Sequence, residues 1–89
     1  MSEAAEQAAQ WMFEQIQQRK MLDQGSAAMQ IRKHFGKDLV YTNQNGNWGI
    51  SPDVLKRFRK LTGDDVIWER GSRMWRTRKQ YDKPGRQQD

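Results

Sequence analysis

Residues 51–78 read SPDVLKRFRKLTGDDVIWERGSRMWRTR, and this stretch decides the fold that the sequence predicts. Ser51 followed by Pro52 is typical of a helix start, because serine caps the first turn and proline fits the first helical position. The apolar residues that recur behind this start at helical spacing are Val54, Leu55, Phe58 and Leu61. Gly63 follows them as a C-terminal stop, so we expect a helix that buries this apolar side.

A β-hairpin is predicted directly after this helix. The segments VIWE and SRMWRTR flank Arg70 and Gly71, which we take as a two-residue turn. In that register Trp68 faces Arg73, and one face of the hairpin carries Val66, Trp68, Arg73 and Trp75. Because a lone hairpin is only marginally stable, we expect both tryptophan rings to pack in the core and the arginines to project from the tip and outer edge.

Two further helices are predicted upstream of residue 37. Over about residues 3–19, apolar residues recur at spacings of three and four: Ala5, Ala8, Ala9, Met12, Phe13 and Ile16. A second helix follows LDQGS, with Asp23 or Ser26 as its N-cap and Gly36 as its stop. Its buried edge is expected to consist of Ala28, Ile31 and Phe35.

The segment DLVYTNQNGNWGI, which separates the second and third helices, predicts another hairpin. Asn45 and Gly46 suit a type I′ turn, because both central residues of that turn need positive φ. The chain is therefore expected to form an α+β domain with three helices, a β-hairpin inserted between helices 2 and 3, and a C-terminal β-hairpin. We expect a single domain over residues 1–79 and a flexible basic tail over residues 80–89.

The composition excludes several classes of protein. The sequence of 89 residues has no cysteine, which excludes a disulfide framework and a thiolate metal site and suits the cytoplasm. Its first residues, MSEAAEQAAQ, are acidic and lack the features of an export signal. The longest apolar runs are three residues, so no membrane span is expected.

Positive charge is concentrated in the C-terminal third. Residues 1–55 carry five basic and six acidic groups, whereas residues 56–89 carry eleven basic and five acidic groups. An anionic partner is therefore expected to dock on the C-terminal third, although a solvated surface is the alternative explanation for the third helix. On that helix Lys56 and Lys60 point away from Phe58, with Arg57 and Arg59 on either side.

The order helix, helix, hairpin, basic helix and basic hairpin resembles a winged-helix domain, in which the third helix commonly enters the major groove of DNA. The stretches YTNQNGNWGI, VLKRFRKLT and WERGSRMWR also resemble a small family of uncharacterised bacterial proteins of about 90 residues. The winged-helix resemblance implies a recognition helix with Lys56, Arg57, Arg59 and Lys60, and a β-hairpin wing with Arg70, Arg73, Arg76 and Arg78. The expected function is binding of nucleic acid, in particular duplex DNA, with base contacts from Arg57 or Arg59.

Other functions are weighed against this one. A protein-protein interaction module or adaptor with Trp48 or Trp75 as an exposed anchor is the main alternative, and a homodimer through the helix surface around Trp11 is a further option. No enzyme is expected, because His34 has no nucleophile partner and Asp64–Asp65 suit a turn. No cofactor and no metal are expected either.

Overall fold

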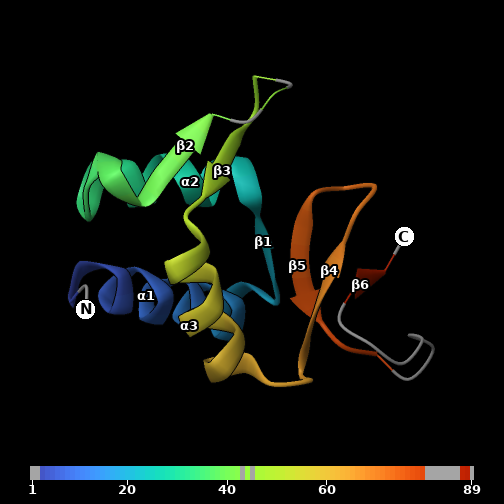
Figure 1. Cartoon of the computed structure of the whole chain (residues 1–89). Helices are drawn as coiled ribbons and strands as arrows, with labels where there is room; N and C mark the ends of the chain where they lie inside the picture. Colours follow the sequence, from blue (N-terminus) through green and yellow to red (C-terminus); the bar gives the residue numbers. More distant parts are fainter. Residues whose placement is uncertain (1–2, 43, 45, 80–86, 89) are drawn as a thin grey trace.

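The structure is a computed structural model of the chain, and it describes residues 3–42, 44, 46–79 and 87–88 (Figure 1). Among these residues the helices are α1 (Glu3–Arg19), α2 (Gln24–His34) and α3 (Pro52–Thr62), with a short 3-10 helix η1 (Lys37–Leu39). The strands are β1 (Met21–Asp23), β2 (Val40–Thr42), β3 (Trp48–Ile50), β4 (Val66–Glu69), β5 (Met74–Thr77) and β6 (Gln87–Gln88). This confirms the predicted α+β class, with one hairpin between helices 2 and 3 and another after helix 3.

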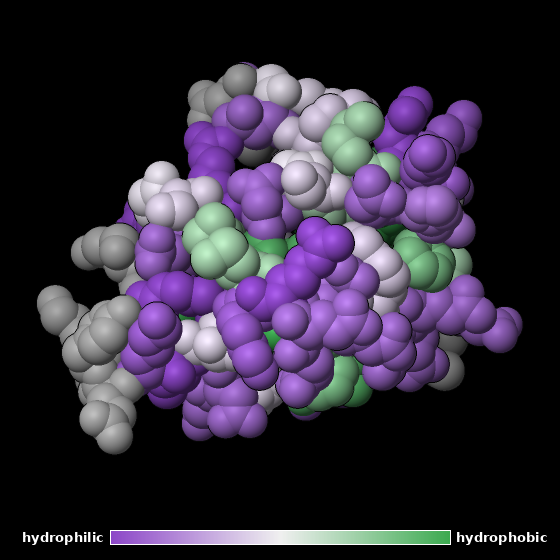
Figure 2. Space-filling model, turned by 180° about the vertical axis from the view of Figure 1, so that it is seen from behind, coloured by the Kyte–Doolittle hydropathy of each residue, from purple (hydrophilic) through white to green (hydrophobic). Residues whose placement is uncertain are grey.

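The helices cover one face of a sheet whose strand order is β1-β5-β4-β6 (Figure 1). Helix α3 packs along α1, and the hairpin β2-β3 packs against α2. The core between them consists mainly of small and aliphatic side chains, with Phe58 and Trp75 as its large rings. In the view of Figure 2, from behind, the described surface is mostly hydrophilic, and the exposed hydrophobic residues form separate small patches.

The two N-terminal helices match their predicted positions. Helix α1 has the predicted bounds, and it buries every residue of its predicted stripe except the half-buried Phe13. Asp23 is the N-cap of α2, because its Oδ2 accepts a hydrogen bond of 2.9 Å from the backbone N of Ser26. Phe35 at the end of α2 is half-buried and packs against Trp11, with ring centroids 6.3 Å apart.

Strand β1 is a short strand between α1 and α2, and the sequence did not predict it. It pairs antiparallel with β5, and only Leu22 of its three residues is buried. A strand of this length shows too little alternation to stand out between two helical patterns. Its pairing ties the C-terminal hairpin to the connection between the first two helices.

Helix α3 begins and ends as predicted. Ser51 Oγ accepts a hydrogen bond from the backbone N of Val54, and Gly63 at φ 57° ends the helix with its N–H donating to the carbonyl of Arg59. One predicted core residue is wrong, because Leu61 is 42% exposed and Thr62 is buried instead. The buried face runs through positions four residues apart, which leaves Leu61 at its margin.

The register of the C-terminal hairpin differs from the predicted one by two residues. Trp68 pairs with Trp75 rather than with Arg73, and residues 70–73 form the loop. The loop of residues 70–73 takes Arg73 to a positive φ of 53°. A shift of two residues keeps each strand residue on its predicted face.

The inserted hairpin also has a longer connection than predicted. Thr42 pairs with Trp48, so residues 43–47 lie between the strands instead of a two-residue turn. The predicted turn residue Asn45 lies outside the described residues, and Gly46 has a φ of 80°.

At the C-terminus, Gln87–Gln88 pair in parallel with Trp68–Glu69 of β4. The rest of the predicted flexible tail, residues 80–86 and 89, lies outside the described residues. Within the part of the chain that the structure describes, none of the helices combines the length and the apolar character needed to cross a membrane.

Candidate nucleic-acid interface

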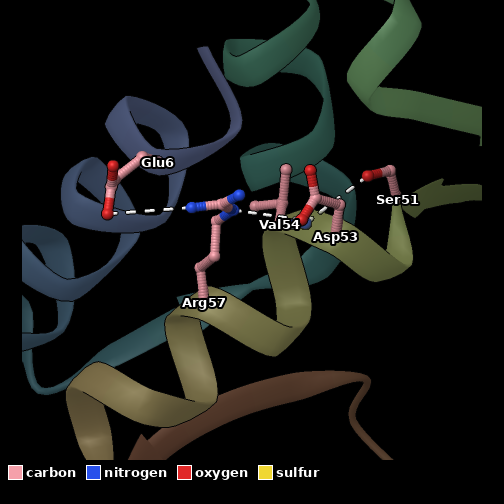
Figure 3. Close-up of polar contacts among 5 residues, drawn as sticks. All are labelled: Glu6, Ser51, Asp53, Val54 and Arg57. Carbon is pink, nitrogen blue, oxygen red and sulfur yellow. Dashed lines mark hydrogen bonds and ion pairs between the residues drawn. The ribbon is translucent and has the colours of Figure 1, made fainter. Parts of the chain in front are cut away.

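The four basic residues predicted for a recognition helix separate into two groups on α3. Arg57 is largely buried by its neighbours, since its side chain is only 23% exposed. Its Nε donates to Asp53 Oδ1 at 3.0 Å, and its Nη1 lies 3.7 Å from Glu6 Oε1 on α1 (Figure 3). Arg57 is therefore held between two carboxylates at the contact of α1 with α3, and its charge is compensated there.

Lys56, Arg59 and Lys60 form the second group, and all three are exposed. They take part in none of the ion pairs found among the described residues. Their charges are therefore presented to solvent from one helix, which begins at the N-cap Ser51 and is fixed by the buried Phe58. We call Lys56, Arg59 and Lys60 the α3 cations.

Two surface grooves run on either side of α3. The first, which we call the α3–hairpin groove, has a volume of about 750 Å³ and opens to solvent. It is lined by Gln24, Tyr41, Ile50, Pro52, Leu55, Lys56, Phe58, Arg59, Trp68 and Trp75. The second, the α1–α3 groove, is lined by Glu6, Ala9, Gln10, Asp53, Lys56, Arg57, Lys60 and Leu61. Lys56 borders both grooves, whereas Arg59 borders the first and Lys60 the second.

Two of the four predicted wing arginines stabilise the protein's own structure. Arg76 on β5 is half-buried, and its Nε donates to Glu69 Oε2 on β4 at 2.8 Å. Arg78 Nε donates to the backbone carbonyl of Asp64 at 2.6 Å, which joins the segment after β5 to the segment before β4. These contacts brace the hairpin across its strands.

The other two wing arginines lie in the exposed loop 70–73. Arg70 is exposed at the start of this loop. The side-chain amide of Asn47 is assigned with its oxygen toward Arg73. In this orientation both terminal nitrogens of the Arg73 guanidinium donate to the Asn47 oxygen. The carbonyl of Arg73 also accepts a hydrogen bond of 3.0 Å from the backbone N of Gln24. The loop is thereby linked to the inserted hairpin and to the start of α2.

The tryptophans of the C-terminal hairpin lie in or beside the core, as predicted. Trp75 is 5% exposed and meets the Phe58 ring edge-on, at a centroid distance of 5.5 Å. Trp68 is half-buried beside Trp75, with centroids 4.7 Å apart. Trp75 is therefore not an exposed anchor for a protein partner.

Three features of this surface were not found from the sequence. The first is Tyr41, which is 49% exposed and lines the α3–hairpin groove. The second is Arg32, whose Cζ lies 5.6 Å from the ring centroid of the half-buried Trp48. The third is Gln24, whose Nε2 donates to the carbonyl of Trp48 at 3.0 Å. The side-chain period of β2 is the one signal that predicts an outward Tyr41.

His34 lies on the surface of α2, where its Nε2 is 3.1 Å from Gln30 Oε1. Among the described residues, no group of three or more histidine or carboxylate side chains is placed to hold a metal ion. The predicted lack of enzymatic activity is tested by none of these observations and stays a prediction. Trp11, near the predicted dimer surface, is half-buried against Phe35, and a homodimer likewise stays a prediction.

Comparison with known proteins places this domain in a family. The model of the Family of unknown function (DUF6953) matches residues 4–77, so the chain belongs to that family. No curated protein and no solved structure matches the chain. The family assignment agrees with the predicted resemblance to uncharacterised proteins and assigns no winged-helix fold.

Proposed function

We propose that this domain binds duplex DNA without catalysing a reaction, and that the α3 cations and the loop 70–73 make the contacts. The observation that carries the proposal is the exposure of Lys56, Arg59 and Lys60 on one rigid helix, outside the ion pairs of the described residues. Exposed cations without carboxylate partners can neutralise phosphates without first breaking an internal ion pair.

The arrangement around α3 supports a winged-helix-like mode of binding. The helix and the hairpin β4-β5 border the same groove, so Arg59 and the hairpin are presented side by side. Strand β1 pairs with β5, and Arg76 pairs with Glu69, so the hairpin is held in a fixed position. A preformed pair of helix and hairpin needs little reordering to meet a duplex.

Arg59 is the better candidate for base readout, and Arg57 is not. The guanidinium of Arg57 is engaged by Asp53 and Glu6, so a contact to guanine would cost both interactions. Arg59 is exposed, and its forked guanidinium can donate two hydrogen bonds to guanine in the major groove. Lys56 and Lys60 then serve as phosphate contacts, which position the protein without reading sequence.

A protein-interaction module remains the second candidate, in the cytoplasmic setting that the sequence predicts. The exposed large apolar side chains that favour it belong to four different elements, namely Met21, Met29, Tyr41 and Leu61. The burial of Trp75 and the cover of Trp48 by Arg32 support nucleic acid over this alternative, because neither ring offers an open anchor.

The test is a salt series of fluorescence anisotropy titrations with a labelled random-sequence duplex. Wild type is compared with a variant that changes all three α3 cations to alanine. The matched control changes Arg19, Lys33 and Lys37 to alanine, which removes the same amount of positive charge. These three residues are exposed and border neither groove on α3. Arg57 is left unchanged because its ion pairs join α1 and α3.

We expect the affinity of the wild type for the duplex to fall steeply with salt concentration. In the α3 variant, the slope of log K against log salt should be smaller in magnitude by about 2–3, because each lost phosphate contact lowers it by about 0.9. The control variant should keep most of the wild-type slope. Absence of binding at low salt, or an equal loss in both variants, would contradict the proposal. An acidic protein would then be the partner to seek.

A further inference from the structure

We propose that the α3–hairpin groove binds an unpaired nucleobase of a single-stranded DNA segment. Tyr41 would be the surface on which the base stacks, and Lys56 and Arg59 would neutralise the adjoining phosphates. This inference rests on the proposed function, because it assigns a second mode of DNA contact beside the same helix. It goes beyond duplex binding, which uses the exposed cations alone.

Tyr41 is an aromatic ring that the fold leaves open to solvent. It is 49% exposed on β2, and it is paired across the hairpin with Gly49 of β3. The ring end of Tyr41 lies over Gly49, since a Cβ built on that glycine would be 2.6 Å from Tyr41 Cζ. The absence of a side chain at position 49 thus lets the tyrosine settle against the backbone of β3. A ring supported in this way is a preformed surface for stacking.

The inner part of the groove is aromatic as well. Phe58, Trp68 and Trp75 are among its lining residues; Trp68 is half-buried, whereas Trp75 is 5% exposed and Phe58 is fully buried. The rings of Trp68 and Trp75 lie at a centroid distance of 4.7 Å. Leu55, which is half-buried, adds aliphatic surface to the lining. Its volume of about 750 Å³ is large enough for a planar base.

The charge of the two grooves on α3 indicates which of them suits an anion. Among the described residues, those that line the α3–hairpin groove include the cations Lys56 and Arg59 and no carboxylate. The α1–α3 groove on the other side includes Glu6 and Asp53, whose negative charges offset part of the positive charge of its cations. A single strand combines bases that stack with phosphates that need neutralisation, so its chemistry matches the first groove.

The test compares two labelled single strands of equal length and charge: an oligothymidylate, and the same backbone with abasic residues throughout. The random-sequence duplex is titrated in parallel as the readout of the proposed function. The proteins are wild type, Tyr41→Ala, and Tyr41→Phe, which keeps the ring. Because Tyr41 is exposed, the alanine variant is expected to fold, and circular dichroism checks this.

Wild type should bind the oligothymidylate about 10-fold more tightly than the abasic strand, as expected for one stacked base. Tyr41→Ala should remove this preference while leaving duplex binding unchanged, and Tyr41→Phe should keep it. Equal affinity for the two strands in wild type would overturn the inference, as would a preference that survives in Tyr41→Ala. Duplex binding without a base preference contradicts this inference alone, whereas a base preference without duplex binding contradicts only the proposed function. Binding of no probe contradicts both.

Discussion

Arg57 on α3 and Glu6 on α1 form an ion pair, with 3.7 Å between Arg57 Nη1 and Glu6 Oε1 (Figure 3). The same guanidinium also donates to Asp53 one helical turn earlier, at 3.0 Å. Arg59, only two residues further along α3, is exposed beside the opposite groove. Two arginines with similar sequence surroundings therefore have different roles, one in joining helices and one in presenting charge.

Arg57→Ala is expected to lower the free energy of unfolding by about 1 kcal/mol, because it removes two partly exposed ion pairs. It should change duplex affinity little. Arg59→Ala is the matched variant, and it should weaken duplex binding with little change in stability. Urea denaturation and anisotropy titrations measure the two quantities, and equal effects of both variants on affinity would contradict the separation.

Trp75→Ala should abolish most of the folded population. The ring is 5% exposed and packs against Phe58 and Trp68, so its removal is expected to cost about 3–5 kcal/mol. A domain of this size has little stability to spare. Circular dichroism with thermal unfolding measures the loss, and Trp75→Phe should retain a cooperative transition. A fully folded, equally stable alanine variant would show that the ring is not part of the core.

Gly49→Ala should move Tyr41 rather than unfold the domain. The new methyl group would lie 2.6 Å from Cζ and 2.9 Å from the hydroxyl oxygen of Tyr41 if the tyrosine did not move. These atoms are the end of a flexible side chain, which can turn away. The preference for oligothymidylate over the abasic strand should therefore fall as it does in Tyr41→Ala. The double variant should show no further loss, since both changes act on the same ring. An unaltered preference in Gly49→Ala would argue against Tyr41 as the stacking surface.

Asp23→Ala should destabilise the start of α2 by about 1 kcal/mol, because the carboxylate of Asp23 caps the backbone N of Ser26 at 2.9 Å. Asp23→Asn serves as the control, since asparagine also caps helices well. Chemical denaturation monitored by circular dichroism compares the three proteins. If alanine and asparagine cause the same loss, the cap is not the source of the effect.

The three helices and the two hairpins of this fold could be predicted because each carries a local signal, whereas the three-residue strand β1 carries none. The stripe from Ala5 to Ile16 and the pair Ser51–Pro52 act within one or two helical turns, so the sequence alone indicates them. The hairpin registers depend instead on pairing between strands. The observed register pairs Trp68 with Trp75 and brings their rings together, and Trp75 in turn meets Phe58; a rule based on the turn alone does not include these contacts.

Only part of the candidate interface could be predicted, because some of its contacts join residues that are far apart in the sequence. Lys56 and Lys60 face solvent as their helical positions require. The carboxylate that engages Arg57 from α1, Glu6, lies 51 positions earlier, and only the packing of α1 on α3 brings it near. The resting position of the Tyr41 ring likewise depends on Gly49 across the hairpin, which becomes its neighbour only once the register is set.

The most direct test of the central claim is a titration of the ¹⁵N-labelled protein with the random-sequence duplex, followed by ¹H–¹⁵N correlation spectra. The account predicts that the amide signals that shift belong mainly to the segment from Lys56 to Lys60 and to the loop 70–73. Signals of α1 around Trp11 should remain unchanged. Shifts centred on α1, or no shifts at low salt, would contradict the claim that α3 and the C-terminal hairpin form a DNA-binding surface.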